Sequence, residues 1–543
     1  MVQRRSTSYR PRSAPPIRFN ADVLLSSQPS VTSGEMNKFP ISFGLRSSIA
    51  INATNLKTPF RLNPRGIRSD SSVWMARILS KAERPVAPRR AVIATSRFGR
   101  QNSSFLLHAI SDSNCSSIGT VSSTLSLEDR VVITGIGVVT SIGRRREAVW
   151  QAIQRGDCGV RRLTGVPGIP DGMLLGATVD IDGQFPGQLK NIPLCRQTAA
   201  EALADARINL ASIDRDRIGC SIGAHMGDTD YVVERLGLQR SFLARGKEPW
   251  WRQWFPNTAC ATVARDYDLR GPRLSNSTAC ASGTIAILKA IRAIRDGQCD
   301  LALAGSSEAI HPLFAAGFYN MGVLADHEEP AQACRPFDLH RNGFVMGEGA
   351  AMFVLERLSH ARERGAAIYA EALGGQILSD ARHVTSLDAN SDALVQLIRG
   401  TLRASGVVPR DISYINAHGT GTPQNDLLET RGIRAAFGRA ADSVCVSATK
   451  SMVGHLVNAS GSVELAITAL ALRDGFAPPT LNLTNPDPEC DLDCVPLVGR
   501  VRPLEHAIKL SIAFGGHLAA IVLRRWTGNQ AREAAPLLGR RAA

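Results

Sequence analysis

One cysteine in the chain has the surroundings of a nucleophile. Cys280 lies among small residues in the stretch 276–290, directly before a run of strong helix formers. This pattern predicts a strand-to-helix turn, with the sulfur at a helix N-terminus where the dipole and unpaired N–H groups favour a thiolate. Most free cysteines, however, are small buried hydrophobic residues. Cys280 is therefore a candidate nucleophile, and the purely structural interpretation stays open at this point.

Two histidine motifs far downstream contain the proton-handling groups that a nucleophilic cysteine requires. His418 lies in Ala-His-Gly-Thr-Gly-Thr-Pro at 417–423, and His455 ends the segment Lys-Ser-Met-Val-Gly-His that begins at Lys450. A histidine in a loop is more often structural than catalytic, so either one alone carries little weight. Together with Cys280 they indicate a site that the fold assembles from distant segments.

The elements that must position these residues alternate along the chain. We expect strands near 130–137, 217–222, 300–304, 351–355 and 412–416, and helices near 144–155, 196–205, 284–296, 391–405, 426–437 and 461–473. This alternation predicts an α/β protein built on a layered sheet. Gly135 and Gly137 lie at the end of the first strand, but the third glycine and the later acid of a dinucleotide loop are missing, so a tight turn fits better.

The three motifs resemble those of the β-ketoacyl-acyl carrier protein synthases, the condensing enzymes of fatty acid and type II polyketide synthesis. The resemblance extends from about Arg130 to about Leu523. It implies a duplicated, thiolase-like α/β fold with five layers, αβαβα. One half would occupy 128–375 with Cys280, and the other 376–525 with both histidines. We saw no internal repeat in the sequence, so the duplication is implied by the resemblance alone.

The resemblance also implies a division of labour at the site. Cys280 would accept an acyl group from acyl carrier protein, and a decarboxylated malonyl unit would then attack it in a Claisen condensation. His418 and His455 would donate to the malonyl thioester carbonyl, while the backbone N–H groups of Cys280 and Phe514 would bind the oxyanion. The site would thus need a neutral donor as well as a nucleophile.

Other residues match family positions that surround the reacting groups. Lys450 would lie inside the site and pair with a carboxylate such as Glu464, since an unpaired buried lysine tends to lose its charge. The remaining matches are Thr420 and Thr422, which would bind the pantetheine arm, and Phe514, Gly515 and Gly516, which would form a gate between the acyl and malonyl pockets. Glycines supply the backbone freedom that such a gate needs.

Three segments depart from the family pattern. In the gate loop at 511–518, Ala513 stands where the family usually has glycine, and His517 adds a titratable group. The segment 256–269 is about four residues shorter than usual at a place that lines the acyl pocket and the dimer interface in the family. The segment 324–329 is acidic where an acidic carrier protein would approach, which predicts weaker docking or docking on other arginines.

The basic charge of the chain belongs to its first part. Residues 1–127 contain 18 Lys and Arg against 5 Asp and Glu, so they account for +13 of the formal charge of +15. Their Ser-, Arg- and Pro-rich, acid-poor composition predicts a disordered leader, either a transit peptide or an extension upstream of the true start. Residues 526–543 are expected to form a loose tail. The nearly neutral remainder has no nucleic-acid-binding signature.

Eleven scattered cysteines without a disulfide framework predict a reducing compartment. Cys490 and Cys494 are too isolated to suggest zinc, and we expect neither a metal nor a cofactor. The longest apolar stretches are too short for a membrane span. We therefore expect a cytoplasmic protein, with a plastid or mitochondrion as the alternative if the leader is a transit peptide.

The sequence thus predicts a homodimeric acyltransferase, a β-ketoacyl-acyl carrier protein synthase of fatty acid elongation. The alternatives are a ketosynthase of a specialised lipid or type II polyketide pathway, a non-catalytic partner subunit, and, more distantly, a thiolase. A non-catalytic subunit would be expected to lack the cysteine, and the pair of histidine motifs disfavours a thiolase.

Overall fold

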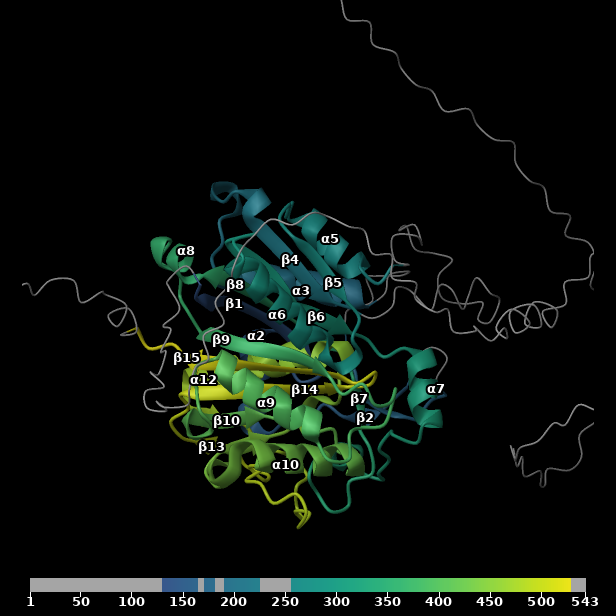
Figure 1. Cartoon of the computed structure of the whole chain (residues 1–543). Helices are drawn as coiled ribbons and strands as arrows, with labels where there is room; N and C mark the ends of the chain where they lie inside the picture. The colour runs from purple at the N-terminus through teal and green to yellow at the C-terminus, as the bar shows by residue number, and fades with distance from the viewer. Residues whose placement is uncertain (1–128, 165–169, 181–189, 225–254, 529–543) are drawn as a thin grey trace, which may run out of the picture. The chain divides into compact units, whose positions relative to one another are not determined.

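The computed structural model describes residues 129–164, 170–180, 190–224 and 255–528. The predicted leader at 1–127 and most of the predicted tail lie outside these residues. Figure 1 shows strands and helices that alternate along the chain, as the sequence predicts. None of the helices in the described part of the chain has an apolar stretch long enough to cross a bilayer.

Five strands from the first part of the chain form one half of a ten-stranded sheet. Their order is β5-β4-β6-β8-β1. Strands β5, β4 and β6 run parallel to one another, whereas β8 and β1 join by antiparallel pairing. The bounds are β1 Val131–Thr140, β4 Ile218–Gly223, β5 Arg273–Asn276, β6 Leu301–Glu308 and β8 Gly349–Arg357.

Five later strands repeat this arrangement. Their order is β11-β10-β14-β15-β9, again with three parallel strands followed by two antiparallel ones. The bounds are β9 Ala370–Ser379, β10 Ile412–Asn416, β11 Cys445–Ser447, β14 His506–Ala513 and β15 His517–Arg525. The halves meet where 131–133 of β1 pair with 370–372 of β9. The fold is therefore duplicated.

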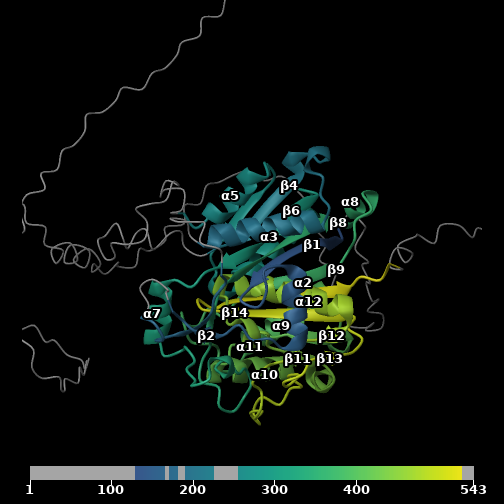
Figure 2. The ribbon, with the colours of Figure 1, turned by 180° about the vertical axis from the view of Figure 1, so that it is seen from behind.

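Helices complete the five layers (Figures 1 and 2). Helices α3 (Asn191–Asp205) and α5 (Thr258–Asp266) cover the outer face of the first half-sheet, and α9 (Asp392–Ala404) and α10 (Pro423–Phe437) that of the second. Helices α6 (Ser282–Arg295) and α12 (Ser460–Asp474) pack together between the half-sheets. Residues 460–472 of α12 are all buried, as expected for a helix enclosed on every side.

The remaining described elements lie around this framework. They are helices α2 Arg146–Arg155, α7 Pro312–Asn320, α8 Leu358–Glu363 and α11 Lys450–Val453, a small sheet of β2 Arg161–Arg162, β3 Leu175–Ala177 and β7 Met346–Gly347, and the pair β12 Phe476–Ala477 and β13 Arg500–Val501. Short 3-10 turns precede the central helices: η4 (Ala279–Ala281) leads into α6, and η8 (Val457–Ala459) into α12.

The duplication leaves a short trace in the sequence that we had not seen. The two central helices occupy equivalent places in the two halves, and each begins at the serine of an Ala-Ser-Gly triplet, at 281–283 and at 459–461. Cys280 in the first half therefore corresponds to Asn458 in the second. The predicted boundary between residues 375 and 376 falls inside β9. The division into two halves at that point stays a prediction.

Candidate active site

The turn that carries Cys280 connects β5 to α6, as the sequence predicts. Strand β5 ends at Asn276, the 3-10 turn η4 follows, and α6 begins two residues after the cysteine. Ala279 adopts a φ of 45°, and the Ser282 hydroxyl accepts a hydrogen bond of 2.8 Å from the backbone N–H of Thr278. Cys280 is thus held in a tight, buried turn at the start of a central helix.

Burial controls the charge of this thiol. Loss of water raises the pKa of Cys280 to about 12, although Lys450 and the backbone N–H groups of Cys280 and Phe514 favour the thiolate. The thiolate predicted from the helix N-terminus is therefore not the resting form, because desolvation of the anion outweighs the dipole and the donors. A base must take the proton when the sulfur attacks.

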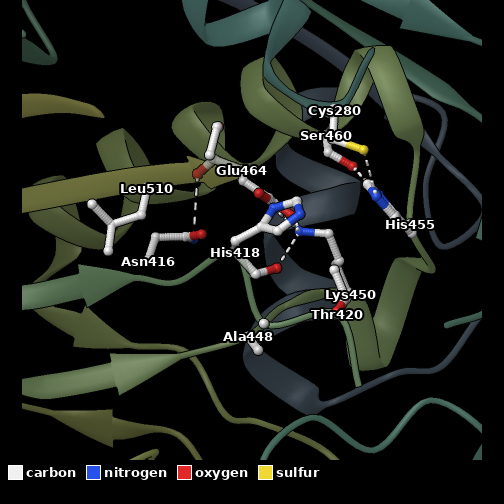
Figure 3. A network of polar contacts seen from close by, with 12 residues as sticks. Cys280, Asn416, His418, Thr420, Ala448, Lys450, His455, Ser460, Glu464 and Leu510 are labelled. Atoms are coloured by element: carbon white, nitrogen blue, oxygen red, sulfur yellow. Dashed lines mark hydrogen bonds and ion pairs between the residues drawn. The ribbon is translucent and has the colours of Figure 1, made fainter. Parts of the chain in front are cut away.

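His455 is placed to be that base. Its Nε2 lies 3.1 Å from Cys280 Sγ, and its Nδ1 lies 2.8 Å from the Ser460 hydroxyl (Figure 3). Burial and the positive charges of Lys450 and Lys509 hold its pKa well below the usual range, so the imidazole is neutral. A neutral ring whose Nδ1–H donates to Ser460 presents a free Nε2 lone pair to the thiol.

His418 follows strand β10 and is also buried and neutral. Burial comes first among the causes that lower its pKa, followed by the charge of Lys450, the neighbouring His455 ring and the charge of Lys509. Its Nδ1 lies 3.4 Å from Lys450 Nζ. An ammonium group only donates, so Nδ1 is the acceptor and the ring proton sits on Nε2. His418 is therefore a neutral hydrogen-bond donor, set edge-on to His455 with ring centroids 5.4 Å apart.

Lys450 and Glu464 meet in the structure, as the sequence predicts. Lys450 begins α11, is fully buried, and donates to the Glu464 carboxylate and to the His418 carbonyl oxygen, at 2.5 Å in each case (Figure 3). The lysine thus contacts both the backbone and the ring of His418. It fixes the position and the tautomer of that histidine.

Two acidic residues of α10 that the sequence analysis missed hold the loop of His418. Glu429 accepts the backbone N–H groups of His418 and Gly419 at 2.6 and 2.7 Å, and Asp426 accepts those of Thr420 and Gly421. Burial raises the pKa of Glu429 to about 7. The sequence did offer a signal for them: two acidic residues, three positions apart, lie in the first turns of the helix that follows the His418 motif.

The turn of Cys280 has its own buried support. Asn458 donates from its side chain to Glu308 at 2.8 Å, and its amide oxygen accepts from the Ser282 hydroxyl at 2.5 Å. These contacts tie the start of α6 to the start of α12. The sequence analysis missed Asn458 and Glu308, and the Ala-Ser-Gly repeat would have pointed to the first of them.

A cavity of about 360 Å³ brings the candidate residues together. Its lining includes Cys280, His418, His455, Thr420, Thr422 and Phe514. The hydroxyl oxygens of Thr420 and Thr422 lie 2.9 Å apart, close enough to share a hydrogen bond. The side chains thus line one cavity, while the binding of a pantetheine arm by these threonines stays a prediction.

The predicted gate is the tight turn between β14 and β15. Phe514 lines the cavity and its ring lies 6.3 Å, centroid to centroid, from that of Phe318. Gly515 and Gly516 follow with φ of 82° and 75°, values that favour glycine. Neither glycine lines the cavity. Their role as a hinge stays a prediction, and so does the effect of Ala513 and His517.

The ligand atoms of Cys280, His418 and His455 lie within 4.8 Å of one another, a spacing that a metal ion tolerates. The ammonium group of Lys450, which contacts His418, opposes a cation at this place. We therefore interpret the three side chains as a nucleophile, a base and a donor.

Comparison with known proteins follows this geometry. Residues 128–361 match the family model "Beta-ketoacyl synthase, N-terminal domain", and residues 369–484 match "Beta-ketoacyl synthase, C-terminal domain". A 3-oxoacyl-[acyl-carrier-protein] synthase 2 of Coxiella burnetii is 38% identical over 73% of this chain and 98% of its own length. The tetracenomycin polyketide synthase ketoacyl synthase alpha subunit of Streptomyces glaucescens is also 38% identical, over 73% and 97%.

Two solved structures of ketosynthases superpose on this chain. A beta-ketoacyl synthase from Burkholderia phymatum superposes with a TM-score of 0.67 at 31% identity, over 73% of this chain and all of that one. A type II polyketide synthase acyl-carrier protein in complex with its ketosynthase, bound to the hexaketide, gives 0.67 at 32% identity over 73% and 99%. The likeness covers both halves of the fold.

Proposed function

The chain belongs to the beta-ketoacyl synthase family and is an acyltransferase of its condensing type, and we propose that it joins an acyl group to a malonyl unit carried by acyl carrier protein. The observation that carries the proposal is the pairing of a buried thiol with a neutral base. His455 Nε2 lies 3.1 Å from Cys280 Sγ, and a second neutral imidazole lines the same cavity.

The first step transfers the acyl group to the enzyme. His455 takes the proton from Cys280, the sulfur attacks the carbonyl carbon of the incoming acyl thioester, and the carrier thiol leaves with a proton. The backbone N–H groups of Cys280 and Phe514 both point at the sulfur region and favour negative charge there. They are placed to stabilise the oxyanion of the tetrahedral intermediate.

The second step makes and uses a carbanion. The bond to the malonyl carboxylate breaks, CO₂ leaves, and its electron pair forms an enolate on the thioester. His418 Nε2–H donates to that oxygen, and His455 is a second donor once its proton has moved to Nε2 and its Nδ1 accepts from the Ser460 hydroxyl. The enolate carbon then attacks the acyl carbonyl carbon on Cys280, the carbon–sulfur bond breaks, and the departing thiolate takes a proton from water through His455. The distinct roles of the two histidines follow from their distinct partners.

A carrier protein and a second copy of the chain are the partners we propose. Several relatives carry acyl carrier protein in their names, and one solved ketosynthase structure contains it in complex. Met321 and Gly322 line the cavity and are exposed, and the acidic residues Asp326, Glu328 and Glu329 follow them on the surface. These acids support the prediction that an acidic carrier docks here weakly or on arginines elsewhere.

The compartment is part of the same proposal. All ten cysteines in the described residues are free thiols, which supports a reducing environment. We infer a cytoplasmic location, with a plastid or mitochondrion as the alternative.

The physiological pathway has two candidates. Relatives named 3-oxoacyl-[acyl-carrier-protein] synthase 2 favour fatty acid elongation, whereas the polyketide relative is equally identical. The altered gate loop favours the second candidate, since it changes the wall between the two predicted pockets.

Product analysis tests the function and decides between the candidates. The purified protein is incubated with acyl- and malonyl-carrier protein, and the products are identified by mass. One added two-carbon unit per saturated acyl chain is expected of fatty acid elongation, and unreduced poly-β-keto chains of a polyketide ketosynthase. Absence of both condensation and decarboxylation in the well-folded protein would refute the proposal.

A further inference from the structure

A second buried lysine reaches the carboxylate of Glu464, the partner of Lys450. Lys509 of β14 is fully buried, and its Nζ lies 2.7 Å from Glu464 Oε2, while Lys450 Nζ lies 2.5 Å from Glu464 Oε1. Lys509 also donates to the Leu510 carbonyl oxygen. One carboxylate thus serves two ammonium groups, one on each oxygen. The sequence analysis had assigned no role to Lys509.

Lys509 lies on a strand face whose residues contact both central helices, α6 and α12. Residues 509 and 511 alternate on β14 and therefore share one face of the strand. From that face Ser511 lies 2.8 Å from Thr284 of α6, while Lys509 contacts Glu464 of α12. The same strand leads into Phe514, which lines the cavity. Lys509 thus lies on the face of β14 that contacts the two central helices, in the strand that leads to Phe514.

Lys509 places a second positive charge close to the two imidazoles. The other titratable and charged groups here are Cys280, Lys450 and Glu464 near the rings, and Glu429 at the backbone of His418. Burial lowers the pKa of Lys509, but Glu464 and then Glu429 favour its charged form. In turn its charge lowers the pKa of both His418 and His455.

We propose that Lys509 is a positioning residue of this active site: it holds Glu464 in the orientation that directs Lys450 to His418, and its ammonium group adds to the positive charge that opposes protonation of both imidazoles. Without the second ammonium group, Glu464 Oε2 loses its partner and the carboxylate is free to rotate. Lys450 Nζ is then no longer held next to His418 Nδ1. The role in the reaction rests on the proposed function, whereas the effect on the imidazoles is independent of it.

Histidine titration tests the electrostatic part. Lys509→Met keeps the length of the side chain and removes its charge, and Lys509→Arg keeps the charge. Ser511→Ala, on the same face of β14, is the matched control. Deuterium exchange at the imidazole C2–H, read by peptide mass against pH, reports the titration midpoint of each histidine without any substrate. Thermal melting of each variant reports its folding.

The midpoints of His418 and His455 should rise by about one pH unit in Lys509→Met, as expected on losing a nearby like charge. They should stay at the wild-type values in Lys509→Arg and Ser511→Ala. Midpoints unchanged in Lys509→Met would overturn the proposal, whether or not the variant melts at a lower temperature, because a merely structural lysine would change the melt alone.

Decarboxylation of malonyl-carrier protein tests the positioning part. In Lys509→Met, kcat should fall by about tenfold with KM nearly unchanged, since the donor to the developing enolate is misplaced while the substrate still binds. A rise in KM at constant kcat would contradict this part. If the wild-type protein neither decarboxylates nor condenses, the proposed function fails, and the histidine midpoints still decide the role of Lys509.

Discussion

In the proposed reaction Cys280 carries the acyl group, whereas the two histidines assist proton transfer and decarboxylation. Substituting one residue at a time therefore distinguishes their roles. Replacing Cys280 by Gln removes the sulfur that holds the acyl group, yet it leaves His418 and His455 facing the cavity. Condensation should vanish, while decarboxylation of malonyl-carrier protein should persist or rise. Radiolabelled acyl transfer and CO₂ release, measured separately, check this.

The histidine variants provide the contrast. His418→Ala should spare acyl transfer to Cys280 and slow decarboxylation by about 10²–10³, as loss of one oxyanion donor does. His455→Ala should also slow acyl transfer, because Nε2 at 3.1 Å is the base for the thiol. Condensation by Cys280→Gln, or wild-type decarboxylation by His418→Ala, would show that the roles are assigned wrongly.

Glu429 makes the stability of the site depend on pH. Burial raises its pKa to about 7 in the folded protein, above the ordinary value of 4.5. The folded state therefore binds the proton more tightly, and stability falls as pH rises from about 4.5 through 7. The loss amounts to about 3 kcal/mol for a shift of this size.

Urea denaturation at pH 5 and pH 8 measures this dependence. Glu429→Gln should be close to wild type in stability at pH 5, because the buried wild-type carboxyl group is then protonated and neutral, like the amide. It should also lose less stability between the two pH values. An identical loss in both proteins would mean that another group titrates.

At the scale of elements, the close approach of α6 and α12 sets the position of the nucleophile. A Cβ atom on Gly283 would lie 2.5 Å from the backbone nitrogen of Ser462, and one on Gly461 would lie 2.6 Å from that of Thr284. Each helix thus contributes a glycine to the other's first turn. The backbone atoms on both sides leave no room for a side chain.

Gly283→Ala should therefore push the start of α6, and Cys280 with it, away from His455. We expect a lower melting temperature and slower acyl transfer to Cys280. Gly317→Ala in α7 is the matched control, since a Cβ there meets nothing within 4 Å and alanine is the better helix former by about 1 kcal/mol. Equal effects of the two substitutions on melting and on acyl transfer would refute this account of the contact.

At the scale of the whole molecule, the edge of the sheet next to the site is the expected place for a partner copy. Among the described strands, the sheet ends at β5, which leads into the turn of Cys280. An edge strand presents backbone groups to which another strand can pair. Helix α5, in the segment that departs from the family pattern, packs against this strand.

We predict a homodimer in which a second copy continues the sheet at β5. Sedimentation equilibrium at micromolar concentration should give twice the mass of the chain. A monomer at that concentration would contradict the prediction and would direct attention to the shortened segment 256–269.

The sequence by itself determined the identity of the reacting groups and the order of the elements. The turn of Cys280, the motifs of His418 and His455, and the alternation of strands and helices are local patterns, and local patterns are written in consecutive residues. A resemblance to a family then supplied the expected roles. It also supplied the duplicated fold, which composition and periodicity did not reveal.

Only the tertiary structure decided which groups meet and what charge they carry. Cys280 and His455 are 175 residues apart in sequence but 3.1 Å apart in the site. The resting thiol, the neutral imidazoles and the shared carboxylate between Lys450 and Lys509 depend on desolvation and on charges from three different elements. Such energies depend on distance and burial, which folding sets and which no stretch of sequence contains.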